Sequence, residues 1–217
     1  GARSLVVCGR PMSDSEVEIR SETGDVLMDR DVGRIFVKSP SLMAGYYNNP
    51  EATEAAIGAD GFLDTGDMGY WLDGEIVITG RAKDLIITGG YNVYPKEIES
   101  YLDELPDVFE SAVIGVADKV KGQVPVGFCR LKDPTQLDAP GATERMEKEI
   151  INKVQELLGA VAKPHNVHFV SSLPKTRSGK LLRRSIQALA EGRDPGDLST
   201  LDDPNSLEEV RRAVEHH

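Results

Sequence analysis

Apolar and polar residues alternate with a period of two along much of the first third of the chain. Val17 and Ile19 stand between charged residues, and a second extended run covers residues 33–38. Because successive side chains of a strand point to opposite faces, this alternation predicts half-buried strands. Asp73-Gly74 lies between two further apolar stretches and predicts a tight hairpin. Short strands with frequent turns indicate a small barrel-like sheet.

Helical signals are local in the first third of the chain and become dominant after Arg81. Asn49 followed by Pro50 predicts the capped start of a short helix that ends near Ile57. Beyond Arg81, strands are expected at 85–88, 108–116, 124–131 and 167–170, and helices are expected to start at Pro95, at Thr143 as a cap, and after Lys180. Mixed strands and helices after a run of strands predict an α+β fold made of two units.

The change of rhythm places the boundary between the two units at Arg81-Ala82-Lys83-Asp84. We expect residues 1–82 to form a barrel-like subdomain at the end of a larger N-terminal domain. Residues 83–217 then form a compact C-terminal domain, a short mixed sheet packed with helices, with a polar tail from about residue 194. Ser206 and Glu209 have the spacing of a capping box and predict a last short helix in this tail.

Charge and hydropathy exclude two classes of function. The chain of 217 residues carries a formal net charge of -11, whereas binding to a phosphate backbone needs a dominant basic surface, so nucleic acid is not expected as a partner. No apolar run approaches the length of a membrane span, and no signal peptide is visible. We therefore expect a cytoplasmic protein.

Cysteine and histidine spacing gives no metal site. Cys8 and Cys129 stand far apart and belong to no ligand pattern, which favours reduced cytosolic thiols. The histidines are His165, His168, His216 and His217. The first two are expected to flank a strand rather than to bind metal, so the prediction for metal ligands is none.

One short segment concentrates positive charge in this acidic chain. Residues 173–184 carry no carboxylate, and their basic side chains are Lys175, Arg177, Lys180, Arg183 and Arg184. A solvated basic face or a localisation signal is the alternative explanation for such a run. Pro174 and Gly179 interrupt the run and apolar residues follow at helical spacing, which favours a rigid loop that binds an anion. A phosphate loop of the GxxxxGK[ST] type is excluded, because Pro174 and Leu181 occupy positions that it needs.

Three motifs occur in order along the chain: GFLDTGDMGY at 61–70, GRAKDLIITGGYNVYPKEIE at 80–99 and LPKTRSGK at 173–180. Together with GRIFVKSPSLMAGYYNNPEAT at 33–53, they resemble the C-terminal part of the acyl-adenylate-forming enzymes, in particular acyl-CoA synthetases of the fatty-acid-CoA-ligase type. The resemblance implies two steps. A carboxylate reacts with ATP and Mg²⁺ to give acyl-AMP, and CoA then takes the acyl group. The domain that binds most of the ATP lies upstream in this family.

The resemblance assigns three residues to the first step. Lys180 matches the catalytic lysine, whose ammonium stabilises charge on the carboxylate and the α-phosphate. Asp67 matches the aspartate that accepts hydrogen bonds from the ribose hydroxyls, and Arg81 matches the arginine that contacts ribose and phosphate. The alternative readings are a plain turn aspartate and a surface salt bridge.

Three further residues match positions that serve the second step. Lys83 matches the hinge about which the C-terminal domain rotates after adenylation, and the alternative is an exposed loop lysine. Gly89 and Gly90 match the loop along which the pantetheine arm of CoA passes. A strand-ending turn is compatible with that role.

The family pattern also implies regulation and incompleteness. In bacterial members, a lysine in the context of Lys180 is reversibly acetylated, which implies a lysine acetyltransferase and a deacetylase as partners. The phosphate loop, the adenine-binding segment and the acyl pocket of the family do not occur in this sequence. We therefore expect a C-terminal fragment that folds, at least beyond Asp84, but is inactive without its N-terminal domain.

Two other functions stay open on the sequence alone. A fatty acyl-AMP ligase would transfer its acyl group to a carrier protein instead of CoA. A non-catalytic regulatory module would reuse the fold, although keeping Asp67, Arg81, Lys83 and Lys180 together argues against it. The acid is also open, because residues 196–204 resemble short-chain synthetases and residues 33–82 resemble fatty-acid enzymes.

Overall fold

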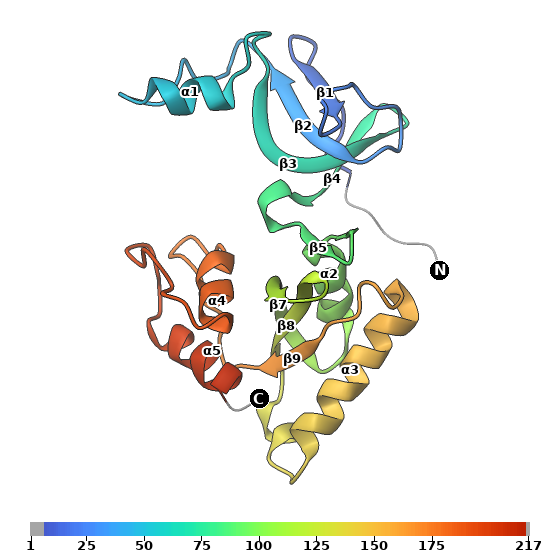
Figure 1. Cartoon of the computed structure of the whole chain (residues 1–217), viewed down its shortest axis with the longest axis vertical. Coiled ribbons are helices and arrows are strands. Elements are labelled where there is room, and N and C mark those ends of the chain that lie inside the picture. Colours follow the sequence, from blue (N-terminus) through green and yellow to red (C-terminus); the bar gives the residue numbers. More distant parts are fainter. Residues whose placement is uncertain (1–6, 216–217) are drawn as a thin grey trace. The chain divides into compact units, whose positions relative to one another are not determined.

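The computed structural model describes residues 7–215 and divides the chain into two compact units, Gly1–Lys83 and Asp84–His217 (Figure 1). Each unit contains its own sheet, and helices occur in both. The α+β class predicted from the sequence is therefore confirmed. The division falls after Lys83, inside the tetrapeptide in which the sequence places the boundary.

The first unit is built on a four-stranded antiparallel sheet in the order β1-β2-β3-β4. The strands are β1 (Glu16–Arg20), β2 (Gly33–Lys38), β3 (Leu63–Leu72) and β4 (Glu75–Arg81). Residues 7–9 add a short bridge on the outer edge of β4. The expected barrel is wrong in one respect. A closed barrel requires its first and last strands to pair with each other. Within the described residues, β1 and β4 do not pair, so the sheet is open.

Local sequence chemistry explains the turns and the helix of this unit. Asp73 and Gly74 both have positive φ, 52° and 81°, as a two-residue hairpin loop of type I′ requires. Helix α1 (Pro50–Ala56) starts as predicted, because Asn49 Oδ1 accepts a hydrogen bond from Ala52 N at 3.0 Å. The hairpin joins β3 to β4 and sets their register from Leu72 to Gly69, after which a bulge shifts the pairing by one residue, so that Asp67 lies opposite Arg81.

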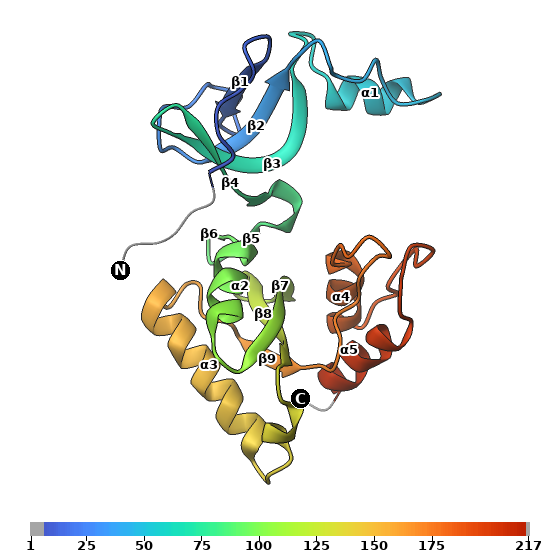
Figure 2. The same ribbon diagram turned by 180° about the vertical axis from the view of Figure 1, so that it is seen from behind.

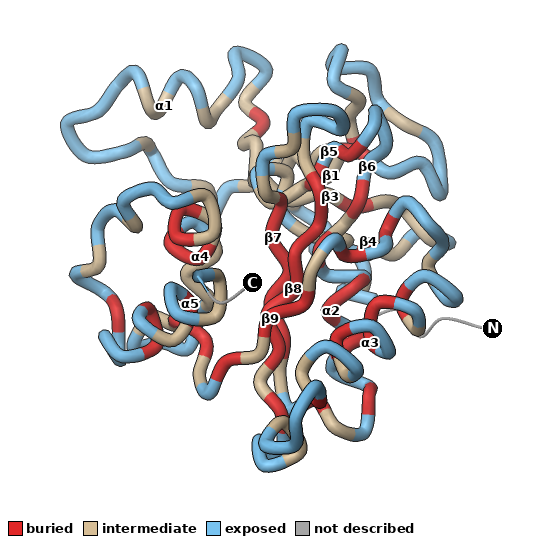
Figure 3. The backbone as a smooth tube through the Cα atoms, turned by 60° about the horizontal axis from the view of Figure 1, so that its bottom comes forward, coloured by how far each residue is buried: buried red, intermediate tan, exposed pale blue. Residues whose placement is uncertain are grey.

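The second unit contains a five-stranded sheet in which the long strand β8 (Gly122–Leu131) is central and the long strand β7 (Val108–Asp118) lies at one edge. Its other strands are β5 (Ile86–Thr88), β6 (Tyr91–Val93) and β9 (Asn166–Phe169). Strand β8 pairs with β7 in the antiparallel sense along one edge, and with β9 in parallel and β5 at one position along the other. Figure 3 shows β7, β8 and β9 as the buried centre of this unit.

Helices cover both faces of this sheet (Figures 1 and 2). Helices α2 (Pro95–Glu104) and α3 (Ala142–Leu158) pack on one face, and α4 (Arg183–Ala190) and α5 (Asn205–Glu215) pack on the other. One-turn helices η1 (Ala82–Asp84) and η2 (Pro134–Leu137) complete the elements. The strands alternate accordingly, since Val113 belongs to the core with α2 while Ile114 belongs to the core with α4.

Two predicted helix caps are wrong. Helix α3 starts one residue before Thr143, and its N-cap is Gly141, with φ of 70°. In α5, Ser206 lies inside the first turn and donates its hydroxyl to Asp203 O at 2.5 Å. The capping carboxylate is that of Asp203, which accepts from Asn205 N at 2.9 Å. In both cases another residue close by, a glycine that accepts positive φ or an aspartate, supplied the cap instead.

The polar segment after residue 194 contains the last helix and also completes the second core. Leu201, Leu207 and Val210 are buried against Phe128 and Ile186, under the face of the sheet opposite to α2 and α3. The polar residues of this segment lie on the outer side of a short amphipathic helix, so composition alone hides its buried face.

Candidate functional site

The first unit places Asp67 and Arg81 directly opposite each other on β3 and β4. Arg81 Nε lies 2.9 Å from Asp67 Oδ1, and Arg81 Nη1 donates to Thr65 O at 3.1 Å. Gly66, with φ of 73°, lets β3 bend between Thr65 and Asp67. The pair is accessible, since the side chains are 26% and 54% exposed, and Asp67 Oδ2 has no partner among the described residues. A directional cation and a free carboxylate oxygen thus lie side by side.

Lys83 lies at the centre of η1, immediately after this pair. Its side chain makes no hydrogen bond or ion pair within residues 7–215. Lys83 is the last residue of the first unit, and Asp84 is the first residue of the second.

In the second unit, Gly89 and Gly90 form the two-residue turn between β5 and β6. Their φ angles are 57° and 83°, which is the conformation of a type I′ turn. A Cβ atom added at either position would meet no atom within 4 Å, so positive φ rather than crowding accounts for both glycines. Gly89 N donates to Lys121 O at 2.8 Å, which fixes this turn against the start of β8.

A cavity of about 420 Å³ opens beside this turn. Gly89 and Tyr91 line one side, and Lys121, Lys163 and His165 bring basic side chains to it. This cavity has no signal in the sequence, because its basic residues come from separate segments that no motif connects. Two lysines facing one cavity are suited to a polyanionic ligand.

Lys180 lies at the end of a narrow loop formed by residues 174–182. Thr176 N donates to Lys180 O at 2.8 Å, and Lys180 N donates to Thr176 Oγ1 at 3.1 Å. Gly179 turns the chain with φ of 80°, and Leu182 N donates to Pro174 O at 2.9 Å. The backbone of Lys180 is therefore fixed while its side chain is exposed. Within the described part of the chain, its ammonium group has no partner.

The basic segment is not uniformly available for a ligand. Lys175 pairs with Glu110 of β7, and Arg183 pairs with Glu99 of α2. The interpretation of all five cations as anion ligands is thus too broad, since these two are neutralised inside the fold. Arg177, Lys180 and Arg184 are exposed and make no ion pair in the described residues.

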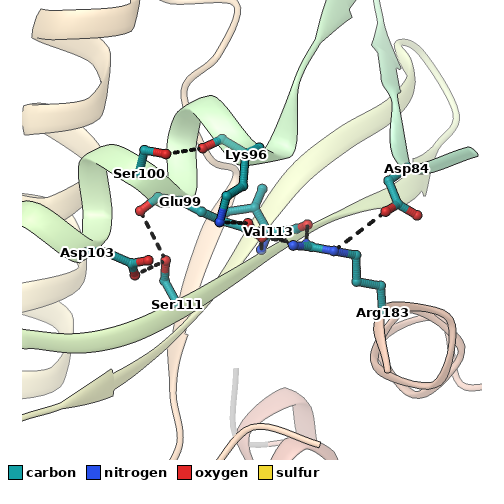
Figure 4. Close-up of polar contacts among 8 residues, drawn as sticks. All are labelled: Asp84, Lys96, Glu99, Ser100, Asp103, Ser111, Val113 and Arg183. Atoms are coloured by element: carbon teal, nitrogen blue, oxygen red, sulfur yellow. Dashed lines mark hydrogen bonds and ion pairs between the residues drawn. The ribbon is translucent and has the colours of Figure 1, made fainter. Parts of the chain in front are cut away.

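Figure 4 shows the surroundings of Arg183. Its Nη2 donates to Glu99 Oε2 at 2.7 Å, its Nη1 donates to Glu99 Oε1 and, at 3.0 Å, to Val113 O. Asp84 Oδ2 lies 3.6 Å from Nε. Burial alone would lower the pKa of Arg183, but the hydrogen bonds and charge of Glu99 and the charge of Asp84 outweigh it and raise that pKa. The guanidinium is therefore permanently charged.

In the sequence, Arg183 is one cation among five in its segment, and no motif marks Glu99 as its partner. A signal was present, because Glu99 lies between Ile98 and Leu102, which form the apolar face of α2. A carboxylate on a buried helical face needs a partner, so it predicts a cation nearby in the fold. Its identity depends on tertiary packing that the sequence does not display.

Cys129 is a free, buried cysteine in the core of the second unit. Burial raises the pKa of Cys129 to about 12, with a smaller contribution from the charge of Asp103, so its thiol is not a nucleophile. Between residues 7 and 215, no group of three or more His, Cys, Asp or Glu side chains is placed to bind a metal ion. The helices of that range also include none with the length and apolar character to cross a membrane.

Comparison with known proteins gives one domain family. Residues 97–180 match the family described as the AMP-binding enzyme C-terminal domain. The chain is 38% identical to a propionate–CoA ligase of Escherichia coli, over 95% of this chain and 34% of that protein. It is 36% identical to an acetyl-coenzyme A synthetase of Pyrobaculum aerophilum, over 95% of this chain and 31% of that protein.

Solved structures agree with the sequence relatives. ATP-bound MatB from Rhodopseudomonas palustris matches with a TM-score of 0.75 and 35% identity, over 86% of this chain and 37% of that chain. The O-succinylbenzoate coenzyme A synthetase of Bacillus subtilis in complex with AMP matches with a TM-score of 0.70 and 35% identity, over 82% of this chain and 34% of that chain. The chain thus spans about a third of the length of the relatives that it matches.

Proposed function

Because this chain belongs to the adenylate-forming enzymes and carries their AMP-binding enzyme C-terminal domain, we propose that it forms the C-terminal portion of an AMP-forming acyl-CoA synthetase. One observation supports this most. Lys180 is held on a fixed backbone loop, exposed, with an ammonium group that no described residue neutralises. An unpaired, positioned cation is what a reaction that gathers negative charge requires.

The proposed overall reaction consumes a carboxylic acid, ATP and CoA. A propionate–CoA ligase and an acetyl-coenzyme A synthetase each match 95% of this chain, a second propionate–CoA ligase matches 66% and a 4-coumarate–CoA ligase matches 83%. We favour a short aliphatic acid because most of these relatives are named for one. The missing N-terminal domain would supply the acyl pocket, since the chain spans about a third of its relatives.

In the proposed first step, an oxygen of the substrate carboxylate attacks the α-phosphorus of ATP and pyrophosphate leaves. Lys180 would contact the attacking and phosphoryl oxygens, where negative charge concentrates. Asp67 Oδ2 would accept from a ribose hydroxyl, while Arg81, oriented by Oδ1 and by Thr65 O, would donate to ribose or phosphate. Mg²⁺ would enter this step with ATP.

Asp67→Asn is expected to raise the KM for ATP about tenfold, because the variant loses a charged acceptor for ribose and weakens the orientation of Arg81. Pyrophosphate exchange with the full-length protein measures this. Asp73→Asn is the matched control, since Asp73 is an exposed aspartate in the adjacent hairpin turn. Equal KM values for the two variants would remove Asp67 from the nucleotide site.

In the proposed second step, the thiol of CoA attacks the acyl carbonyl of acyl-AMP and AMP leaves. Lys83 would be the hinge about which the C-terminal domain rotates between the steps, so that a different face of that domain meets the reactants. The turn at Gly89 and Gly90 would then face the pantetheine arm. The adjacent cavity with Lys121 and Lys163 would hold the phosphates of CoA, which need compact cations.

Lys121→Ala and Lys163→Ala are each expected to raise the KM for CoA about tenfold, because each removes a charged contact to phosphate. Pyrophosphate exchange, which needs no CoA, should not change. Lys119→Ala is the control, since Lys119 is exposed near the same turn and does not line the cavity. A normal KM for CoA in both cavity variants would place CoA elsewhere.

Two further proposals follow from the same assignment. We propose that the protein acts in the cytoplasm, in keeping with its substrates. We also propose that a lysine acetyltransferase and a deacetylase regulate Lys180, which is exposed on a surface loop. Acetylation would remove the charge needed in the first step.

The fatty acyl-AMP ligase alternative is not favoured, because the relatives described above form CoA thioesters by name. Measuring the consumption of free CoA by the full-length protein separates the two. CoA loss that depends on both acid and ATP supports the synthetase. Transfer of the acyl group to a carrier protein without CoA loss would support the ligase.

A further inference from the structure

Arg183 links three parts of the second unit. It is the first residue of α4 and lies three positions after Lys180. Its guanidinium meets α2 through Glu99, β7 through the carbonyl of Val113, and the start of the unit through Asp84 (Figure 4). An exposed arginine that only attracted an anion to the loop would need none of these contacts.

The geometry of the Arg183–Glu99 pair fixes orientation as well as distance. Both carboxylate oxygens of Glu99 accept from the guanidinium, so the pair is bidentate. Glu99 is only 1% exposed, and its Oε1 also accepts from Val113 N at 2.8 Å. The carboxylate therefore has a single position, and it imposes that position on the first turn of α4.

The loop that carries Lys180 is thus anchored at both ends on the same strand. At its start, Lys175 pairs with Glu110 of β7. At its end, Arg183 donates to Val113 O, also on β7. Between these anchors, the hydrogen bonds of Thr176 and Leu182 close the loop. Loss of the second anchor would leave the first turn of α4 held by its core packing through Ile186 and by the backbone hydrogen bonds of the loop, so that Lys180 is less firmly positioned.

We propose that Arg183 is a positioning residue, which fixes the loop of Lys180 to α2 and β7 through its bidentate pair with Glu99. The inference rests on the proposed function, because it assigns to Lys180 a role in the first step. Arg183 itself contacts neither substrate nor reacting atoms in this role. Its effect is on where the ammonium of Lys180 stands when ATP is bound.

The test uses the full-length protein with the double substitution Glu99→Gln and Arg183→Met. The single Arg183→Met would leave the buried carboxylate of Glu99 without its bidentate partner, with only the exposed Lys96 at 3.9 Å and Val113 N as contacts among the described residues, whereas the double variant removes both charges of the pair together. Arg184→Met is the matched control, because Arg184 is an exposed neighbour without an ion pair in the described residues. Thermal unfolding confirms that each variant is folded.

The expected result is a split between the two half-reactions. In the double variant, kcat of pyrophosphate exchange should fall about tenfold with the KM for ATP unchanged, while thioester formation from supplied acyl-AMP stays within about twofold. The single substitution Arg183→Lys, with Glu99 intact, should retain part of the exchange rate that the double variant loses. Lysine keeps the positive charge opposite Glu99 but cannot form the bidentate pair. A folded double variant with normal exchange kinetics, or with both half-reactions reduced equally, would overturn the proposal.

Amide hydrogen exchange separates this inference from the proposed function. Residues 174–182 should exchange about tenfold faster in the double variant than in the Arg184→Met control, whatever reaction the protein catalyses. Unchanged protection of this loop overturns the inference. Absence of pyrophosphate exchange in the unmodified full-length protein would instead overturn the proposed function.

Discussion

Replacing Lys180 with alanine is expected to lower the rate of pyrophosphate exchange about 100- to 1,000-fold, an effect equal to that of removing one preorganised donor from a transition state. The ammonium of Lys180 has no protein partner in the described residues, so no existing contact would be lost in the substitution. The backbone hydrogen bonds that hold the loop stay in place, because they involve only main-chain atoms of residue 180. The loss would therefore be one of catalysis rather than of folding.

The second half-reaction distinguishes a chemical role of Lys180 from a general defect. Thioester formation from supplied acyl-AMP and CoA should stay within about twofold of the unmodified rate. In this step the thiol attacks the acyl carbonyl, so no further negative charge develops at the α-phosphorus for Lys180 to stabilise. Arg177→Ala is the matched control, being an exposed cation of the same loop. Equal loss of both half-reactions in Lys180→Ala, or an equal effect of Arg177→Ala, would refute the assignment.

Much of the local structure was predictable because its causes are local. The hairpin at Asp73-Gly74 and the cap at Asn49 depend on residues within a few positions of each other. The caps at Thr143 and Ser206 failed for the same kind of reason, since Gly141 and Asp203 stand close by and compete for the role. The burial of α5 failed differently, because only packing against Phe128 and Ile186 reveals which of its faces is covered.

In the candidate site, too, residues placed by local structure were easier to predict than residues placed by tertiary packing. The hairpin predicts that Asp67 and Arg81 lie near each other, but the register of its two-residue turn alone would place Asp67 opposite Gly80. A bulge between Met68 and Gly69 shifts the pairing by one residue and brings Arg81 opposite Asp67, and the sequence gives no sign of this bulge. Lys175 and Arg183 could not be separated from Lys180, because Glu110 and Glu99 lie 65 and 84 positions away from their partners in the chain. Motif matching identifies the loop, and only the fold identifies which of its cations are already neutralised.

Lys83→Pro is expected to separate the rates of the two half-reactions by about 100-fold, as small misplacements of catalytic groups do. Lys83 is the central residue of the one-turn 3-10 helix η1. Helices of this class have φ angles of about -50° to -70°, which suit proline. Proline at position 83 is therefore compatible with the backbone conformation of η1, but it prevents the change of φ at this residue that a hinge requires. One half-reaction should continue at close to its normal rate, while the step that needs the other conformation slows.

Lys83→Ala makes this a test of the backbone rather than of the side chain. The side chain of Lys83 has no partner in residues 7–215, so its removal should leave both half-reactions within about twofold of normal. Pyrophosphate exchange and thioester formation from acyl-AMP are measured for both variants, with thermal unfolding as a check on the fold. If proline slows both steps equally in a folded protein, or slows neither, the rotation does not pivot at Lys83. Loss of activity in Lys83→Ala would instead assign the role to the ammonium group.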